Sequence, residues 1–367
     1  MDKFQYFLEY LANEPIIIQL IWVVSFVLFI AIIVLIIYLK GLRTYLRDKG
    51  RIVEKYSKKY ELLLITYLYA EEDEFGVNKE QNLIIKRLKK GILFKFKRQV
   101  IISTLLKLRN EISGELADSI QNLYNKAKLK KYALLKLNNR QWDIIVTGIR
   151  ELRLFNIKEA HDDVIKHINH PKKEVRKEVQ LYLINLFHFE GLRFLNDLKT
   201  SLSEWDQIQL LEELQKIDNQ ELVDVSDWLK SDNFYVVIFA IKLVKIYNKF
   251  EMKEPILNLL NHPNENVRIE LFPVLSHLHI IESKEVLKDK FYELSQEEQF
   301  LFFKLLEELA DKDDESFIEQ QLNHSNFEIR LLALKLLKYL NETKFNQLET
   351  SSNDAEFETL VKYVKNS

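Results

Sequence analysis

One long apolar run dominates the hydropathy pattern of the chain. From Pro15 to Leu39 the sequence carries no charged residue, and only one Gln and one Ser interrupt the 24 residues of Ile16–Leu39. A helix of this length, at about 1.5 Å per residue, measures roughly 36 Å and exceeds a hydrocarbon core of about 30 Å. We therefore expect a transmembrane helix over residues 16–39, preceded by a short extracytoplasmic segment over residues 1–15.

The charges that flank this run predict its orientation. Only Lys3 precedes it, whereas seven basic residues follow by position 58, namely Lys40, Arg43, Arg47, Lys49, Arg51, Lys55 and Lys58. Because cytoplasmic flanks are enriched in Lys and Arg, we expect everything after residue 39 to be cytoplasmic. The acidic residues before the run argue against a cleaved signal peptide, which begins with basic residues. The expected location is the inner or plasma membrane, with a single pass.

Farther along the chain, apolar positions follow a helical period and the sequence repeats itself. The segment Asn169–Val179 (NHPKKEVRKEV) returns 92 residues later as Asn261–Leu271 (NHPNENVRIEL). In the same way, Ser231–Lys245 returns 93 residues later as His324–Lys338. Apolar residues at i, i+3, i+4, i+7 and i+8 predict amphipathic helices with one buried stripe. We expect stacked units of about 31 residues, each with two helices and two short turns.

These units resemble the HEAT repeat in its short form of about 30 residues. The shared pattern is a polar residue and Pro, followed by Val-Arg ahead of an apolar helix. It occurs as Pro171 with Val175-Arg176 and as Pro263 with Val267-Arg268. A third unit has Ser325 in place of Pro and continues with Ile329-Arg330. The resemblance implies that Arg176, Arg268 and Arg330 pack between successive units and bond to an acidic or turn residue of a neighbour. Val237 replaces this Arg in one unit and interrupts the row. The family binds other macromolecules and has no single activity.

The expected fold is all-α, an α-α superhelix (a HEAT-like solenoid) preceded by one transmembrane helix. Between the anchor and the clear repeats, helices are expected at roughly 40–70, 79–90, 92–109, 113–126, 129–138 and 139–155, with Ser113 as an N-cap candidate. After residue 39 the expected segments are a basic juxtamembrane helical region over 40–78, degenerate helical repeats over 79–156, HEAT-like repeats over 157–345 and a C-terminal tail over 346–367.

Charge divides the chain into a basic and an acidic part. Residues 40–131 carry 22 Lys and Arg against 11 Asp and Glu, whereas residues 132–367 have a net charge of −11. Anionic headgroups attract nearby Lys and Arg by about 1 kcal/mol each, so we expect the basic part to lie against an anionic lipid surface. The expected membrane contacts are Lys40, Arg43, Arg47, Lys86, Arg87, Lys89, Lys90, Lys95, Lys97 and Arg98.

Seven of these basic residues fall in Lys86–Arg98 (KRLKKGILFKFKR), where apolar and aromatic residues alternate with them and no acid occurs. Amphipathic basic segments of this kind lie on membrane surfaces. The same residues could bind nucleic acid phosphates, with aromatic rings available for stacking. A third interpretation is a helix pair with an apolar core face and a solvated Lys face.

Candidate catalytic chemistry is sparse. The chain has no Cys, which excludes disulfides and Cys-ligated metals. Its seven scattered Gly cannot supply a Gly-rich phosphate loop. It contains neither HExxH nor GxSxG. His170, His262 and His324 recur at equivalent turns, which favours turn capping over metal binding. We expect no enzyme activity, no metal and no cofactor.

Glu178 and Glu270 stand 92 residues apart, at the position where Phe239 and Leu332 complete the apolar stripe of other units. A carboxylate that is half-buried there needs a partner. One interpretation places both at the edge of the stripe, paired with a nearby Lys or Arg. The other makes them polar contacts in a groove that holds a protein partner.

Together these features predict a scaffold or adaptor that holds a protein partner, another membrane-associated assembly, at the cytoplasmic face. The acidic distal part favours a basic partner surface. Two alternatives stay open: a nucleic-acid-binding HEAT-like protein that uses residues 86–98, and a helical-repeat enzyme with an unrecognised site. The net charge of −11 argues against nucleic acid, because a DNA-wrapping solenoid presents a basic face.

Overall fold

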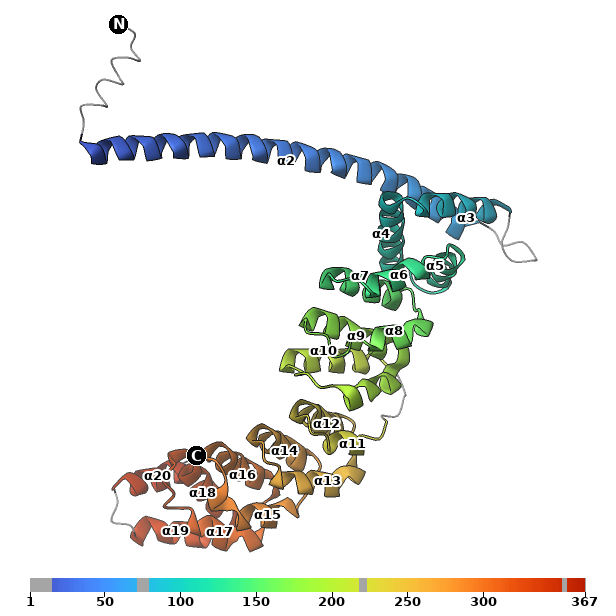
Figure 1. Cartoon of the computed structure of the whole chain (residues 1–367). Helices are drawn as coiled ribbons and strands as arrows, with labels where there is room; N and C mark the ends of the chain where they lie inside the picture. The colour runs from blue at the N-terminus through green and yellow to red at the C-terminus, as the bar shows by residue number, and fades with distance from the viewer. Residues whose placement is uncertain (1–14, 71–78, 218–222, 352–354, 367) are drawn as a thin grey trace. The chain divides into compact units, whose positions relative to one another are not determined.

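The computed structural model describes residues 15–70, 79–217, 223–351 and 355–366 (Figure 1). Within these ranges the chain is built of packed helices and contains no strand, which confirms the all-α prediction. The chain divides into two compact units, residues 1–131 and 132–367. The expected outer segment up to residue 14 and the end of the juxtamembrane region, residues 71–78, lie outside the described residues.

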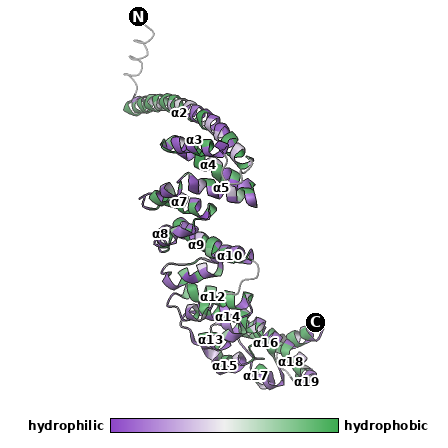
Figure 2. Cartoon of the chain, turned by 90° about the vertical axis from the view of Figure 1, so that its right-hand side faces the viewer, coloured by the Kyte–Doolittle hydropathy of each residue, from purple (hydrophilic) through white to green (hydrophobic). Residues whose placement is uncertain are grey.

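The first unit begins with α2 (Ile16–Leu68), a single helix of 53 residues. Its large apolar side chains from Ile16 to Leu39 are 37–80% exposed, so they pack against nothing in this unit. Figure 2 shows this part of α2 in the hydrophobic colour, whereas the later helices are mixed. By length and composition, α2 is the one helix among the described residues that could cross a membrane. The helix expected over residues 40–70 is the second half of the same α2.

The second half of α2 packs against α3 (Lys79–Ile92), α4 (Lys95–Glu111) and α5 (Glu115–Lys126). Tyr60, Leu64 and Tyr67 of α2 are buried in this contact. Gln81 at the start of α3 donates to the carbonyl of Tyr67 at 3.2 Å, while Gly91 at its end lies beside Tyr60. Therefore α3 runs antiparallel to α2, and the end of α3 points back toward the apolar half.

Helix α5 begins one residue later than the sequence suggests. Its N-cap is Gly114, with a φ of +65°, and no side chain caps the helix there. The prediction of Ser113 as N-cap is therefore wrong. Gly adopts positive φ without the steric cost that a side chain adds, so the backbone turn at Gly114 starts the helix without a hydrogen bond from a capping side chain.

The second unit alternates long helices with short helices and 3-10 turns. After α6 (Lys130–Leu137), the long helices are α7 (Trp142–Leu154), α9 (Lys173–Phe187), α10 (Glu204–Gln215), α12 (Phe234–Ile246), α14 (Glu265–His277), α16 (Gln296–Leu309) and α18 (Phe327–Leu340). The short ones are α8 (His161–Ile165), α11 (Ser226–Leu229), α13 (Lys253–Asn258), α15 (Ser283–Asp289) and α17 (Glu315–Gln320). Consecutive long helices pack on one another: α7 on α9, α9 on α10, and α12 through α14 and α16 to α18.

The predicted apolar stripes form the core of this stack. Val236, Phe239, Ala240, Leu243 and Val244 of α12 are fully buried, as are the corresponding apolar residues of α18 from Ile329 to Leu337. The helices α10 and α16, expected as weaker units, start with equivalent capping boxes at Ser203 and Ser295. The expected two helices per unit are present in most units, and the first of the two is short, from four residues in α11 to seven in α15.

The histidines of the repeated turns cap those turns, as predicted. Nδ1 of His170, His262 and His324 accepts the backbone N–H two residues later, at 3.1, 3.1 and 3.0 Å. The hydroxyl of Ser231 does the same for Asn233 at 3.2 Å. Each turn is thereby closed just before a long helix begins.

The arginines of the HEAT-like pattern bond to these same turns. Nη1 of Arg176, Arg268 and Arg330 donates to the carbonyl of the turn histidine six residues earlier, at 2.9, 2.7 and 3.0 Å. The bonded turn belongs to the arginine's own unit, so the expectation of a bond to a neighbour needs correction. The contact between units is seen at Arg268, whose Nε also donates to Glu298 of α16 at 2.6 Å.

The predicted C-terminal tail is wrong. Two further helices follow α18, namely α19 (Glu342–Ser351) and α20 (Ala355–Asn366), which pack on α18 and on each other. Leu360, Val361 and Val364 of α20 are buried, and Nζ of Lys338 donates to the carbonyl of Val364 at 2.7 Å. The expected boundary at residue 345 falls inside α19.

Candidate functional site

The connection between α3 and α4 forms a sharp turn that we call the basic elbow, residues 86–98. On its inner side Leu88 and Ile92 are buried in the core of the first unit. At its tip Leu93 and Phe94 are 73% and 60% exposed. Two adjacent apolar side chains that project from a folded turn have no role in its core, so they are available for an outside contact.

Charged side chains surround this exposed tip, and five of the predicted contacts are exposed: Lys86, Arg87, Lys89, Lys90 and Lys95. Lys97 and Arg98 instead build the elbow. Nζ of Lys97 lies 4.7 Å from the ring centroid of Phe94, and Nη1 of Arg98 donates to the carbonyl of Ile92 at 3.0 Å. The first contact is a cation–π interaction and the second caps the end of α3, so both hold Phe94 in place.

The other predicted basic residues, Lys40, Arg43 and Arg47, are exposed on α2 between the apolar run and the elbow. The rings of Tyr56 and Phe96, 5.8 Å apart, mark where the elbow meets α2. Tyr56 is 17 residues beyond Leu39, which corresponds to about 25 Å of helix. Because α3 returns toward the apolar half, the elbow is the end of the packed helices that lies nearest to that half.

Glu178 does not line an open groove. Its side chain is 4% exposed, with Nη2 of Arg150 at 3.0 Å and Nη2 of Arg153 at 2.9 Å. Arg153 also donates to Asn185 at 2.8 Å, and Asn185 donates in turn to Glu213 of α10 at 2.8 Å. The hypothesis of a partner contact is wrong for Glu178, because a network across α7, α9 and α10 already satisfies its carboxylate. The interpretation as a paired carboxylate is confirmed.

Glu270 occupies the equivalent position on α14 and is held more loosely. Its carboxylate lies 3.7 Å from Nζ of Lys242 of α12, and its side chain remains 29% exposed. Burial raises the pKa of Glu270 above its usual value, although Lys242 and Lys245 oppose this effect. The pairing with a nearby lysine is confirmed, and the partial exposure leaves one oxygen within reach of solvent.

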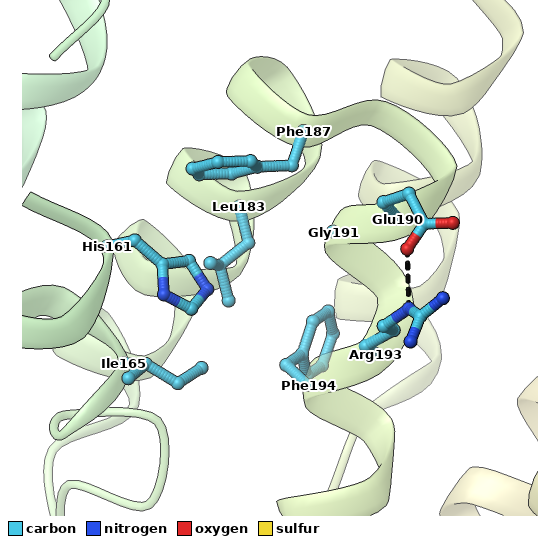
Figure 3. A pocket seen from close by; sticks show the side chains of 8 residues that line it. All are labelled: His161, Ile165, Leu183, Phe187, Glu190, Gly191, Arg193 and Phe194. Carbon is cyan, nitrogen blue, oxygen red and sulfur yellow. Dashed lines mark ion pairs between the residues drawn. The ribbon is translucent and has the colours of Figure 1, made fainter. Parts of the chain in front are cut away.

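A recess of about 290 Å³ opens between α8, α9 and η2 (His188–Asp197), as Figure 3 shows. Most of its lining is apolar, with the ring of His161 packed edge-on against Phe187 at 5.1 Å between centroids. Glu190 and Arg193 pair with each other at its edge at 2.5 Å. The recess offers an apolar surface with one imidazole and holds no arrangement of nucleophile and base.

Two features of the second unit were missed by sequence reasoning. A Cβ on Gly191 would overlap the carbonyl group of Leu183, so only Gly permits η2 to approach α9 this closely. Nζ of Lys284, 4% exposed, lies 2.8 Å from Asp314, which is completely buried, and 2.7 Å from Asp311. Lys288 also pairs with Asp314. The isolated Gly191, between Phe189 and Phe194, was a signal for the close approach of η2 to α9. The buried pair of Lys284 and Asp314 has no local signal in the sequence.

Comparisons with known proteins place the chain in no family. No family model matches it, and no curated protein matches it. Among solved structures, an engineered protein aligns with 84% of this chain and 88% of its own at 14% identity and a TM-score of 0.28. A second engineered protein aligns with 69% of this chain and 95% of its own at 13% identity and a TM-score of 0.24. The complex of CpcE and CpcF of phycocyanin lyase from Nostoc sp. PCC7120 covers 81% of this chain and 99% of its own, at 12% identity and a TM-score of 0.23.

Proposed function

We propose that this protein is a single-pass membrane scaffold whose HEAT-like solenoid holds a protein partner at the cytoplasmic face of the inner or plasma membrane. The observation that supports it most is α2. Its apolar half leaves every large side chain from Ile16 to Leu39 exposed, while its other half packs into the first unit. Exposing such a surface to water costs about 25 cal/mol per Å², so the segment calls for a lipid environment.

The orientation is supported by the exposed cations that follow the apolar run, among them Lys40, Arg43 and Arg47. Under the positive-inside rule they keep the repeats in the cytoplasm. The basic elbow adds five exposed cations and an apolar tip at the end of the packed helices nearest the anchor. This combination suits the headgroup region of an anionic bilayer.

The scaffold role is supported by the stacking of long helices in sequence order, with consecutive amphipathic stripes buried between them. A stack of this kind exposes an extended surface in proportion to its length. Anchoring would convert a weak contact with another membrane-associated assembly into a favoured one by raising its effective concentration.

The absence of native Cys makes the topology directly testable. In intact cells, a membrane-impermeant maleimide should label Asn13→Cys at once and Lys312→Cys only after permeabilisation. The full chain should resist extraction by alkaline carbonate, whereas a chain lacking residues 1–39 should be soluble and melt cooperatively. Labelling of Lys312→Cys in intact cells, or release of the full chain by carbonate, would overturn the proposal.

A second comparison tests the tethering. Crosslinking in membranes, followed by mass spectrometry, should retrieve the same partner from the full chain and from a variant with an unrelated apolar helix in place of residues 16–39. The chain without residues 1–39 should retrieve it at least roughly tenfold less well. Equal recovery of the partner from the anchorless chain would show that binding does not depend on the membrane anchor.

A further inference from the structure

The long helices α12, α14, α16 and α18 each carry a half-buried apolar side chain at the same position. We call these the face row: Ile238, Ile269, Phe300 and Leu331, each 31 residues after the one before. All four are half-buried, in contrast to the core residues of the same helices. Since the four helices pack consecutively, the row crosses the stack from one helix to the next.

Polar and charged side chains border the face row on both sides. Three residues before each member stand Tyr235, Asn266, Glu297 and Glu328. Four residues after each member stand Lys242, Pro273, Lys304 and Lys335. Positions i−3 and i+4 share the helix face of position i, so on α16 and α18 the row runs between a carboxylate and an ammonium.

We propose that the face row is an interface with a second copy of this chain, related by a two-fold axis that runs along the row. Such an axis reverses the helix direction and leaves the order of the helices unchanged. Each apolar member then meets its own counterpart. Lys335 meets Glu328 of the second copy. Lys304, which pairs with Glu307 of its own helix at 2.7 Å, meets Glu297 of the second copy as well. Lys242 keeps its pairing with Glu270 of its own chain.

Charge decides between this axis and the other two-fold axis that lies in the same surface. An axis parallel to the helices through the middle of the row would pair α12 with α18 and α14 with α16. It would place Lys335 opposite Lys242 and leave both glutamates opposite uncharged residues, so no pair of opposite charges would form. It would also reverse the order of the helices, so that the two copies would run in opposite directions. The axis along the row keeps the two stacks running the same way. That both copies share one bilayer rests on the membrane anchor proposed above.

A modest contact is sufficient in this setting. Two-fold symmetric dimers are the commonest oligomers, and each contact between two different residues, such as Lys335 with Glu328, occurs twice in them. Two copies confined to one bilayer have a high effective concentration, so four apolar side chains and their charged borders can hold them together.

Crosslinking of single cysteines in native membranes tests this interface. Phe300→Cys in the full chain should form dimers with a short bis-maleimide, roughly tenfold more than Tyr292→Cys, a control at an exposed residue outside the row. In the Phe300→Cys background, Lys335→Glu should reduce the dimer roughly tenfold, and Glu328→Lys with Lys335→Glu should restore it. Circular dichroism melts establish that the charge variants fold.

Equal crosslinking at the control position, or failure of the double charge reversal to restore the dimer, would overturn the proposal. Linkage of Phe300→Cys to a different polypeptide, such as an amphipathic helix of another protein, would overturn it as well. These results leave the anchor untouched, because the labelling of Asn13→Cys and Lys312→Cys reports topology independently of dimer formation.

Discussion

Glu178 of α9 and Glu270 of α14 occupy the same position of equivalent helices, yet only Glu178 is fully enclosed. The side chain of Glu178 is 4% exposed between Arg150 and Arg153, whereas that of Glu270 is 29% exposed with Lys242 at 3.7 Å. The first carboxylate is part of a hydrogen-bonded network. The second carboxylate is partly desolvated and has one distant cation near it, so burial raises its pKa.

Replacement of each Glu by Gln should therefore have opposite effects. Glu178→Gln should lower the free energy of unfolding by about 2 kcal/mol, because it weakens the charge-assisted hydrogen bonds that the buried carboxylate accepts from Arg150 and Arg153. Glu270→Gln should raise it by up to about 1 kcal/mol at pH 7. Urea unfolding of the detergent-solubilised full chain measures both, and a loss of stability in both variants would contradict the assignment.

The Glu270 effect should depend on pH in a defined direction. A carboxyl group with a raised folded pKa contributes stability that is present below its unfolded pKa of about 4.5 and lost as pH rises through the folded pKa. The advantage of Glu270→Gln should thus shrink as the pH is lowered from 7 toward 4.5. An advantage that stays constant over this range would mean that the charge of Glu270 is not the cause.

The buried pair of Lys284 and Asp314 should stabilise the contact between α15 and the turn before α17. Lys284→Met leaves Asp314 buried with Lys288 as its remaining cation and should cost about 3 kcal/mol. Lys284→Met combined with Asp314→Leu removes both charges and should recover most of that loss. Thermal melts of the parent chain, both single variants and the double variant decide this, and a double-variant loss equal to the sum of the single losses would show that the pair is not coupled.

Gly191→Ala should lower the free energy of unfolding by about 3 kcal/mol, because its Cβ would force η2 away from the backbone of α9 at Leu183. Gly50→Ala is the matched control, since a Cβ at Gly50, in the exposed middle of α2, meets nothing within 4 Å. Ala is favoured over Gly in a helix interior, so this control should be neutral or slightly stabilising. Equal effects at the two positions would contradict the close approach.

The features that the sequence predicted well are those that depend on local spacing. The apolar stripe from Val236 to Val244 and the turn histidines repeat at fixed offsets, so a single pattern specified both burial and capping. The sequence also predicted the bounds of α3 to α7 to within a few residues, because amphipathic periodicity depends only on neighbours along the helix.

The features that it missed depend on contacts between distant segments. The arginines that enclose Glu178 belong to α7, where the repeat pattern is degenerate, and no spacing rule connects positions 150 and 178. The tail was missed because α20 has only a few apolar residues, and they became a stripe only once α18 was available to cover them. In the elbow, Lys97 and Arg98 look like surface cations in the sequence and are used within the structure.

His324 should make stability sensitive to mild acid. Burial lowers its pKa, and Nδ1 accepts the N–H of Asn326, which requires the neutral ring. A group with a depressed folded pKa contributes stability that is present above its unfolded pKa of about 6.5 and lost as pH falls through the folded value. His324→Ser reproduces the natural arrangement at Ser231 and should lose less stability between pH 7.5 and 5.5, by about 1 kcal/mol. Urea midpoints at the two pH values test this; parallel losses in both proteins would exclude the turn as the source.

The elbow should contact anionic lipid through electrostatics rather than deep insertion. An apolar segment of roughly 36 Å in a core of about 30 Å requires α2 to tilt, which lowers the elbow toward the headgroups. Along α2 the elbow is about 25 Å from the apolar run, about three times the Debye length of about 8 Å, so its lysines reach the headgroup charges only if α2 tilts. A polarity-sensitive dye on Leu93→Cys should shift to the blue in nanodiscs that contain phosphatidylserine and shift back in 1 M salt, where the Debye length is about 3 Å.

Leu83→Cys is the matched control for this experiment, because Leu83 is exposed on α3 near the end that is farther from Leu93. Since α3 runs antiparallel to α2, residue 83 lies on the side away from the anchor, and its dye should respond to neither lipid charge nor salt. Identical responses at positions 83 and 93 would point to a general effect of the nanodisc. An unchanged dye at position 93 would mean that α2 holds the elbow clear of the bilayer, and its exposed Leu93 and Phe94 would then be left for a protein partner.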